Sequence, residues 1–432
     1  MWMRWISTQR FRASAWAIAL FAVWFVYLAI IATAGLWASV GVPHTIPPFE
    51  DLYAILSAAD CQKLGYDVFR ANPCDMGQRV HVYGSIWLWL GKVGLGRSDV
   101  LWLGVGIDLL FASLAVRIIN PKDCSQFIGS ALVLLSPATT LAMERCNNDL
   151  IIFCLLSCAA LLVSSRNGCL YYLGILTSFF AGLLKIYPAI TLVAAVPMAD
   201  SKGRLKATIV IAFLLIAAWV LFDANELTLL ISIVPRPEGR YAFGGTLLFK
   251  YLGVQRHVFF LSFALAVIAL VIAVRLAAAL KVKCVVIDEH RPLVSHYYFG
   301  LAVLSFTFLA NTNFDYRLIF NIFFLPWLFL LKRATGDNQV VGRTIVGCVG
   351  LMIGLMWSEA LVAHVPSALS NLFVHAGYGD TTEGILRVMR VAKHLSAWCL
   401  LTGLAAIGIK TLRMQSVHTS AVDRLASKLR ST

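Results

Sequence analysis

Long apolar segments recur along almost the whole chain, separated by short polar stretches. Read in order, they predict about twelve membrane-spanning helices, near residues 13–40, 98–117, 127–143, 149–164, 170–185, 187–199, 207–223, 257–280, 294–311, 318–331, 344–364 and 394–411. Several are shorter than the roughly 20 residues that a helix needs to cross a bilayer, or share a tight turn with the next segment. A transmembrane β-barrel would show short alternating stretches instead. The pattern predicts an all-α polytopic membrane protein with one membrane domain, residues 13–411.

Composition supports the same class, because 59% of the residues are hydrophobic, only 13% are charged, and the mean hydropathy is +0.79. These values exclude a soluble enzyme, a disordered chain and a coiled coil. The formal net charge of +14 would suggest a nucleic-acid partner for a soluble protein. In a membrane protein, Lys and Arg instead set the orientation of the spans, so we expect no nucleic-acid partner.

Basic residues near the ends of the chain predict its orientation. Arg4, Arg10 and Arg12 precede the first apolar run, which is too long for a signal-peptide core. We therefore expect residues 1–12 to be cytoplasmic and the tail, residues 412–432, to lie on the same side. Apolar residues at three- and four-residue intervals in that basic tail predict an amphipathic helix on the membrane surface, with a disordered tail as the alternative.

The longest connections, residues 41–97, 224–256 and 365–393, lie on the outer side in this orientation. Acidic residues gather there as well, although they contribute little to topology. We therefore expect the functional site to lie in the outer loops, and above all in residues 41–97.

Glu50 and Asp51 open a predicted helix in this first outer loop, directly after Pro47 and Pro48. Carboxylates in the first turn stabilise the N-terminus of a helix, so capping explains them without any chemistry. Their place at the membrane boundary also makes them candidate catalytic residues. Farther along the loop, aromatic and apolar residues predict an interfacial helix with its rings at headgroup depth: Tyr83, Trp87, Leu88, Trp89 and Leu90.

Two of the ten cysteines, Cys61 and Cys74, also lie in this loop. In an oxidising compartment they are a candidate disulfide, although their separation along the chain does not establish that their side chains meet. The other cysteines fall mostly in or beside apolar segments, and no spacing resembles a zinc or haem site. We expect no metal site.

A dense polar turn, residues 144–149, links the third and fourth predicted spans and contains Glu144, Arg145, Asn147 and Asp149. Asn and Asp are common in solvated hairpin turns, which is one interpretation. The alternative is a functional group of side chains, because Glu144 and Arg145 extend one helix while Asp149 begins the next.

Three further places bring cations to the outer side. Lys185 follows about fifteen apolar residues and precedes Tyr187, so its ammonium either pairs with an anion or extends to the membrane surface. The remaining candidates lie in two outer turns: Arg236, Arg240, Asn313, Asp315 and Arg317. Arg317 has a simple structural interpretation as the partner of Asp315 or of a neighbouring acid.

The order of these motifs is similar to that of the GT-C glycosyltransferases, and most closely resembles glycosyltransferase family eighty-seven, the polyprenol-phosphate-mannose-dependent group. The resemblance covers residues 45–200 and continues afterwards only in the topology and in one N-F-D-Y-R turn. The matching motifs are D-L-Y at 51–53, A-x-x-x-x-x-G-Y-D at 59–67, E-R-x-N-x-D at 144–149 and L-K-x-Y-P at 184–188. Adjacent Glu50 and Asp51 leave the catalytic carboxylate open, and Gly-Ser follows Tyr83 where proline is frequent in the family.

The resemblance implies a bacterial inner-membrane enzyme that transfers a hexose, mannose in this family, from a polyprenyl phosphate to a lipid-linked or glycan acceptor at the periplasmic face, with inversion. Asp51 or Glu50 would be the general base. The donor phosphate would be bound by cations: Lys185, Arg145, Arg236, Arg240 and Arg317. Substrate-binding residues would be Tyr53, Glu144, Asn147, Asp149, Tyr187, Asn313 and Asp315. Neither a cofactor nor a divalent metal is implied, and membrane lipids would surround the protein.

Two other classes fit the same chain. About twelve spans with both ends inside are typical of a secondary transporter or a glycolipid flippase, whose site lies near the membrane midplane between repeats. Asp108 is the clearest mid-span acid for such a site, but the two halves show no similarity. A non-catalytic lipid-binding or polymer-export partner is the third possibility.

Overall fold

The computed structural model describes residues 13–282, 287–310, 312–335, 339–375 and 382–430. Within these ranges, seven helices are long and apolar enough to cross a membrane. They are α2 (Ala15–Ala34), α5 (Val100–Ile119), α11 (Lys202–Phe222), α14 (Val258–Ala279), α15 (Arg291–Ala310), α17 (Gln339–Met356) and α19 (Thr382–Arg430). The structure is therefore that of an all-α polytopic membrane protein.

Two bent pairs of helices are candidates for further spans. One pair is α6 (Cys124–Leu134) with α7 (Pro137–Glu144), bent by 48°, and the other is η7 (Asp315–Phe323) with α16 (Leu325–Thr335), bent by 44°. Counting both pairs gives at most nine spans in the described ranges, so the predicted twelve are not confirmed.

The difference between the twelve predicted spans and the number observed lies partly in short helices. The predicted spans at 149–164 and 170–185 are α8 (Asp149–Val163) and α9 (Gly168–Leu184), which are shorter than a bilayer requires. The segment after Lys185 is broken into η4 (Tyr187–Ile190), α10 (Thr191–Ala194) and η5 (Val196–Met198). The remaining elements are η1 (Ala38–Val40), α3 (Glu50–Lys63), η2 (Ser85–Leu88), α4 (Trp89–Lys92), η3 (Arg97–Asp99), α12 (Ala224–Ile233), α13 (Gly245–Tyr251), η6 (Ile287–His290) and α18 (Ser358–His375).

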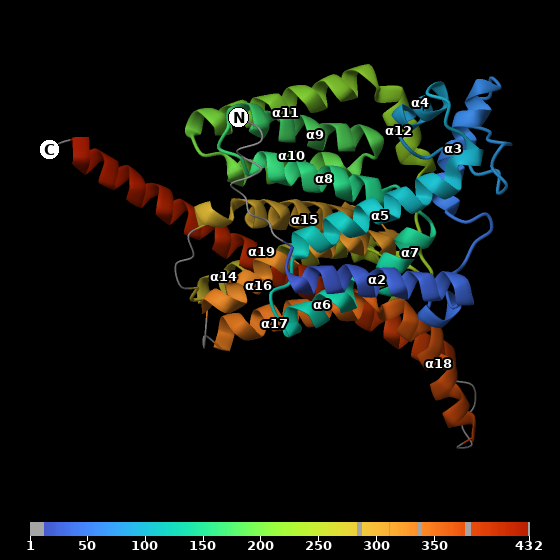
Figure 1. Cartoon of the computed structure of the whole chain (residues 1–432). Coiled ribbons are helices and arrows are strands. Elements are labelled where there is room, and N and C mark those ends of the chain that lie inside the picture. Colours follow the sequence, from blue (N-terminus) through green and yellow to red (C-terminus); the bar gives the residue numbers. More distant parts are fainter. Residues whose placement is uncertain (1–12, 283–286, 311, 336–338, 376–381, 431–432) are drawn as a thin grey trace.

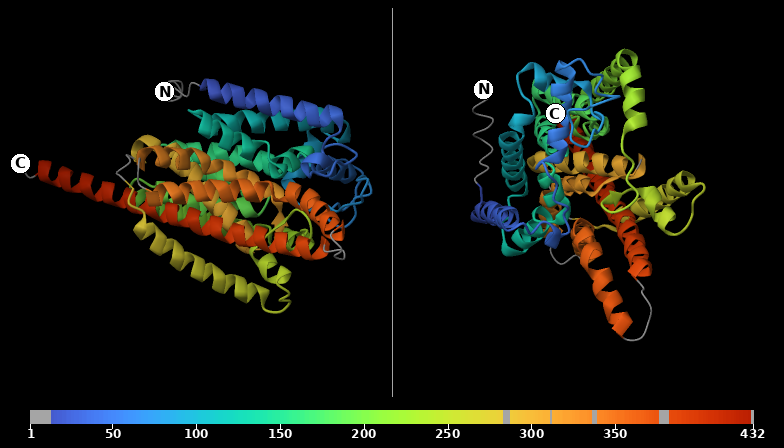
Figure 2. Two further views of the ribbon diagram at one scale, coloured as in Figure 1. Left: turned by 90° about the horizontal axis from the view of Figure 1, so that it is seen from below. Right: turned by 90° about the vertical axis from the view of Figure 1, so that its right-hand side faces the viewer.

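The long helices run roughly alongside one another, and α3, α4 and α12 lie together at one end of the molecule (Figures 1 and 2). We call this the α3 end. α5 begins there and finishes at the opposite end, where α6 starts. The outer helices α11 and α14 leave large apolar side chains uncovered, including Phe213, Phe222 and Phe260. Exposed apolar faces of this size fit a surrounding of membrane lipid.

Aromatic side chains fill the centre between α5, α8 and η7. The Phe153 ring stacks on Phe323 at 4.6 Å between centroids and meets Phe111 edge-on at 4.9 Å. Trp327 in α16 is fully buried as well, and its indole nitrogen donates to Thr411 in α19 at 3.1 Å. This packing fixes η7, which carries Arg317, against the short helix α8, which begins at Asp149.

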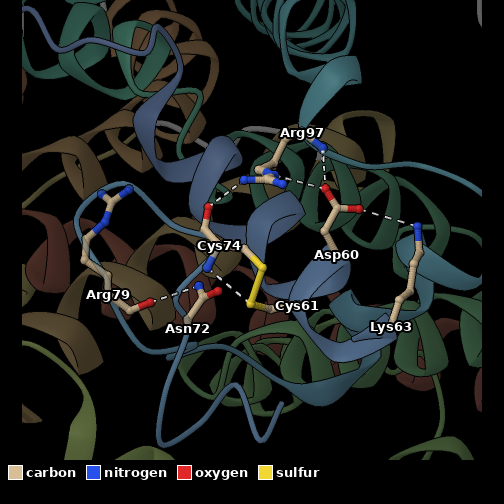
Figure 3. Close-up of a disulfide and its surroundings, with 7 residues drawn as sticks. All are labelled: Asp60, Cys61, Lys63, Asn72, Cys74, Arg79 and Arg97. Carbon is tan, nitrogen blue, oxygen red and sulfur yellow. Dashed lines mark hydrogen bonds and ion pairs between the residues drawn. A yellow bond between two sulfur atoms is a disulfide. The ribbon is translucent and has the colours of Figure 1, made fainter. Parts of the chain in front are cut away.

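A disulfide joins Cys61 at the end of α3 to Cys74, with their Cα atoms 5.6 Å apart (Figure 3). Arg97 extends across the same loop, where it donates to the carbonyl oxygen of Cys74 at 3.0 Å and pairs with Asp60 at 3.2 Å. Asn72 then donates to the carbonyl oxygen of Arg79 at 3.0 Å. These bonds attach the loop to the C-terminal end of α3 and hold the backbone at Arg79.

The interfacial helix predicted near Trp87 is only partly as expected. Short helices η2 and α4 do form, and Trp89 is 62% exposed. Trp87, however, is buried, and its indole nitrogen donates to the carbonyl oxygen of Leu184 at 3.0 Å. Trp87 is therefore packed inside the protein and not at its surface, because the carbonyl at the end of α9 offers its N–H a partner there.

The C-terminal tail continues α19 without a break as far as Arg430 (Figure 1). The tail is helical, as predicted, but no turn separates it from the rest of α19. Residues 1–12, predicted to be cytoplasmic, lie outside the described residues.

Candidate functional site

The N-terminus of α3 is hydrogen-bonded to the turn between α7 and α8. The amide of Phe49 donates to the carbonyl oxygen of Glu144 at 3.2 Å, and the amide of Asp51 donates to that of Arg145 at 3.1 Å. Phe49 adopts a left-handed conformation (φ 59°), and its ring lies against Gly104, where a Cβ would approach it to 2.2 Å. The first loop and the polar turn are thereby joined into one surface.

Asp51 is the centre of this junction. One carboxylate oxygen accepts from the amide nitrogen of Asn147 at 2.6 Å, and the other lies 3.3 Å from the guanidinium of Arg145. The side chain is 12% exposed, so it is reachable from the surface although its charge is paired. A carboxylate held by a neutral amide and one cation keeps its orientation without being enclosed.

Glu50 is held differently, between two arginines. Its carboxylate lies 2.7 Å from Arg79 and 3.0 Å from Arg145. Arg79 also pairs with the buried Asp75 at 2.8 Å, and although burial alone would raise the pKa of Asp75, the bonds from Arg79 outweigh it and lower that pKa. Sequence reasoning missed Arg79, because a single arginine 29 residues from its partner carries no pattern.

A second cluster surrounds Asp149 at the first turn of α8, where negative charge suits the helix N-terminus. The Asp149 carboxylate lies 2.6 Å from the Lys185 ammonium and 3.5 Å from Nε of Arg317, and it accepts from the Tyr187 hydroxyl at 2.8 Å. Lys185 also donates to the side-chain oxygen of Asn148 at 2.7 Å. The polar turn, the L-K-x-Y-P hairpin and the N-F-D-Y-R turn therefore meet at one point.

Tyrosine rings surround the Lys185 ammonium, with Tyr83, Tyr187 and Tyr316 centred 5.3, 5.7 and 5.7 Å away. Such ring faces attract a cation. Sequence reasoning placed Tyr83 at the membrane interface and did not connect it with Lys185. Gly84 explains the contact, because its amide donates to the carbonyl oxygen of Leu184 and a Cβ there would lie 2.0 Å from the oxygen of Leu183. Only glycine allows the loop to approach the end of α9 this closely.

The two clusters share one electrostatic environment. Burial lowers the pKa of Lys185 to about 8, against the opposing attraction of Asp149, and the charge of Asp51 also acts on it. Burial likewise raises the pKa of Tyr83 well above its ordinary value, with Asp51 as the next largest cause. The charges of Asp51 and Asp149 therefore both act on Tyr83 and on Lys185.

A cavity of about 370 Å³ opens beside Lys185 and Arg317. Arg236 lies on its wall, as does Asn313 in β2 (Asn313–Phe314), which pairs antiparallel with β1 (Ala242–Phe243). The rest of the wall is mainly apolar and comes from α12, α14 and α15: Leu230, Ile231, Val234, Phe259, Phe306 and Ala310. The cavity thus combines three cations with a mainly apolar lining.

Other predicted site residues lie away from this cavity. The Glu144 carboxylate is held by His44 at 3.1 Å and by the Thr45 amide at 2.8 Å, and not by the Asp51 group. Tyr53 is hydrogen-bonded to Arg97, so its hydroxyl serves the disulfide loop. Neither of these predicted substrate-binding residues faces the cavity.

Asp315 belongs to a separate buried group, and the half-exposed Arg240 lies at its edge. Asp315 pairs with Lys393 of α19 at 2.6 Å, and Lys393 also contacts Glu359 of α18 at 2.7 Å. Arg240 lies 3.9 Å from the other oxygen of Glu359. Arg317 therefore pairs with Asp149 and not with Asp315, two residues before it. Lys393 was missed, since its partners lie 34 and 78 residues away along the chain.

In the described parts of the chain, no three His, Cys, Asp or Glu side chains are grouped so as to hold a metal ion. No family model, curated protein or solved structure matches this chain. What the site offers chemically is an oriented carboxylate, Asp51, next to buried cations at the wall of an apolar cavity.

Proposed function

We propose that the protein is a membrane glycosyltransferase that moves a hexose from a polyprenyl-phosphate sugar to an acceptor hydroxyl. The observation that carries this proposal is the cavity beside Lys185 and Arg317, which combines buried cations with hydrocarbon walls. A polyprenyl phosphate complements both features, because its head is anionic and its tail is apolar. The family resemblance suggests mannose as the sugar and a lipid-linked or glycan acceptor, and the basic loops suggest a periplasmic working face.

The donor phosphate would bind at Lys185 and Arg317. The ion pair of Arg317 with Asp149 engages Nε at 3.5 Å, so the terminal guanidinium nitrogens remain for the paired bonds that phosphate oxygens favour. Lys185 has three donor hydrogens, of which two point to Asn148 and Asp149. Arg236 on the cavity wall would add a third positive charge. The isoprenoid chain would lie along α12, α14 and α15.

Asp51 is our candidate for the general base. The acceptor oxygen attacks the anomeric carbon, the bond from that carbon to the phosphate oxygen breaks, and the acceptor proton passes to the Asp51 carboxylate. Polyprenyl phosphate leaves with the bonding electron pair, and Lys185 and Arg317 stabilise its charge. A single displacement of this kind inverts the anomeric carbon.

Asp51 suits this role better than Glu50 for a geometric reason. Glu50 lies between Arg79 and Arg145 at 2.7 and 3.0 Å, so each of its two carboxylate oxygens already faces a guanidinium. Asp51 has one cation at 3.3 Å, and its charge acts on Lys185. Arg145 would then position both carboxylates and would not bind the donor.

The test is a transfer assay with the purified full-length chain in liposomes. Labelled polyprenyl phosphates carrying mannose, glucose, galactose or arabinose are supplied with a glycolipid extract, and released polyprenyl phosphate and labelled product are measured. We expect Asp51→Asn to lower transfer by about 10²- to 10⁴-fold with donor binding unchanged, because the amide keeps the shape but accepts no proton. Asp67→Asn is the matched control, since Asp67 lies in the same loop and is exposed.

Two results would change this proposal. Full transfer by Asp51→Asn together with its loss in Glu50→Gln would reassign the base. No transfer with any of the four donors, combined with movement of the labelled lipid between leaflets, would favour the flippase or transporter alternative.

A further inference from the structure

A second cavity, of about 590 Å³, lies at the opposite end of the molecule from Asp51, between α6, α16 and α17. Its walls are mostly apolar: Gly129, Phe329, Ile345, Val346, Val349 and Ile353. Gly350 lines it too, and a Cβ added at Gly350 would meet no atom within 4 Å. The cavity is therefore an open groove that a long apolar chain fits.

Charged residues gather at one side of this groove. Lys332 and Arg333, at the end of α16, and Asp123, before α6, all line it, and Arg333 pairs with Asp123 at 2.9 Å. Lys122 directly precedes Asp123 in the chain, and the positive charge of Arg333 contributes to lowering its pKa, after partial burial. Among the described residues, three cations thus gather near one carboxylate at this side of the groove.

The groove also holds a buried polar group. Gln126, 7% exposed, lines the cavity and accepts from the backbone amide of Lys122 at 3.0 Å. This bond holds the backbone at Lys122, just before α6, in place beside Asp123.

We propose that this groove binds an anionic phospholipid, with an acyl chain along α17 and the phosphate at Lys332, Arg333 and Lys122. The apolar walls alone would accept any lipid, and the excess of positive charge selects an anionic headgroup. This inference is independent of the proposed transfer reaction, because the groove shares no residue with the cavity at Lys185.

Native mass spectrometry of the full-length chain, titrated with phosphatidylglycerol or phosphatidylcholine, tests the proposal. We expect wild type to prefer phosphatidylglycerol and the double variant Lys332→Gln with Arg333→Gln to lose about tenfold of that preference. The matched control is Lys202→Gln with Lys206→Gln, two exposed lysines of α11 at the same end. This control should keep the preference.

A second pair of variants tests the groove itself. Gly350→Phe fills it and should reduce binding of phosphatidylglycerol, whereas Gly347→Phe, on the same helix but outside the cavity, should not. Equal binding of the two lipids by wild type, or equal losses in the test and control variants, would overturn the proposal. Preferential binding of undecaprenyl phosphate that Gly350→Phe removes would overturn the assigned occupant.

Discussion

Two buried ion clusters near the α3 end differ in the sign of their charge. The Asp149 cluster has one carboxylate against two cations, Lys185 and Arg317, and it borders a cavity. The Lys393 cluster has one buried ammonium against two buried carboxylates, Asp315 and Glu359, and lies closed between α18, α19 and η7. Its second cation, Arg240, is half exposed and lies 3.9 Å from Glu359. An excess of buried positive charge next to open space suits an anionic ligand, whereas the opposite excess in a closed place suits a structural joint.

The second cluster still affects the first through the backbone. Asp315 lies two residues before Arg317, and its amide donates to the carbonyl oxygen of Tyr241 at 2.7 Å. Lys393 therefore ties the last long helix to the segment that presents Arg317. We interpret Lys393, Asp315 and Glu359 as positioning residues, because none of them lines the cavity.

The largest expected effect is on stability. Lys393→Met leaves Asp315 and Glu359 buried side by side without their main counter-ion, and removing one member of a buried ion pair costs about 3–5 kcal/mol. Thermal unfolding of the purified protein in detergent measures this loss. The triple variant with Lys393→Met, Asp315→Asn and Glu359→Gln should recover much of it, because no unpaired charge remains. Loss of donor binding in Lys393→Met at unchanged stability would contradict the structural role.

The next effect is on ligand affinity. Lys185→Met removes a cation from the cavity wall but leaves Asp149 paired with Arg317, so we expect a smaller loss of stability than in Lys393→Met. Affinity for the polyprenyl-phosphate sugar should fall about 10- to 100-fold, as for the loss of one charged hydrogen bond. Equilibrium binding of labelled donor to the purified protein measures this. Unchanged affinity in both Lys185→Met and Arg317→Met would return these cations to a purely structural role.

Sequence reasoning identified much of the site because its motifs share one property, their position at the same ends of successive apolar segments. That is why Asp51, Asn147, Asp149, Lys185 and Arg317 could be grouped before any contact was known. Sequence reasoning could not predict which residues of this group form ion pairs with one another. Which acid Arg317 meets depends on the extended β2 and the following 3-10 helix, which send Asp315 towards Lys393.

The predicted number of spans was not confirmed, for a related reason. Apolar runs signal burial in either lipid or protein, and hydropathy does not separate the two. α8 lies inside the bundle, where Phe153 packs between α5 and η7, so its residues are apolar without α8 having the length of a span. Trp87 shows the same ambiguity on a smaller scale, since an aromatic ring near an interface also serves as a buried packing residue.

The smallest expected effect is a pH dependence that separates Lys185 from an arginine. Burial lowers the pKa of Lys185 to about 8, so between pH 7 and 9 its protonated fraction falls from about nine-tenths to about one-tenth. The diester phosphate of the donor does not titrate in this range, so donor affinity should fall by up to about tenfold. Lys185→Arg is the control, because a guanidinium stays charged and its affinity should remain flat.

Stability should respond with the opposite sign. Above pH 8 the folded chain has lost the Lys185 proton, while the unfolded chain keeps it up to about pH 10.5, so the unfolded state binds more protons over this interval. The contribution of Lys185 therefore makes the unliganded protein more stable as pH rises from 8, and thermal unfolding of wild type compared with Lys185→Arg isolates it. Donor affinity that stays constant from pH 7 to 9 in the wild type would show that Lys185 does not act on the phosphate as a charge, and Arg317 with Arg236 would then be the phosphate ligands to test.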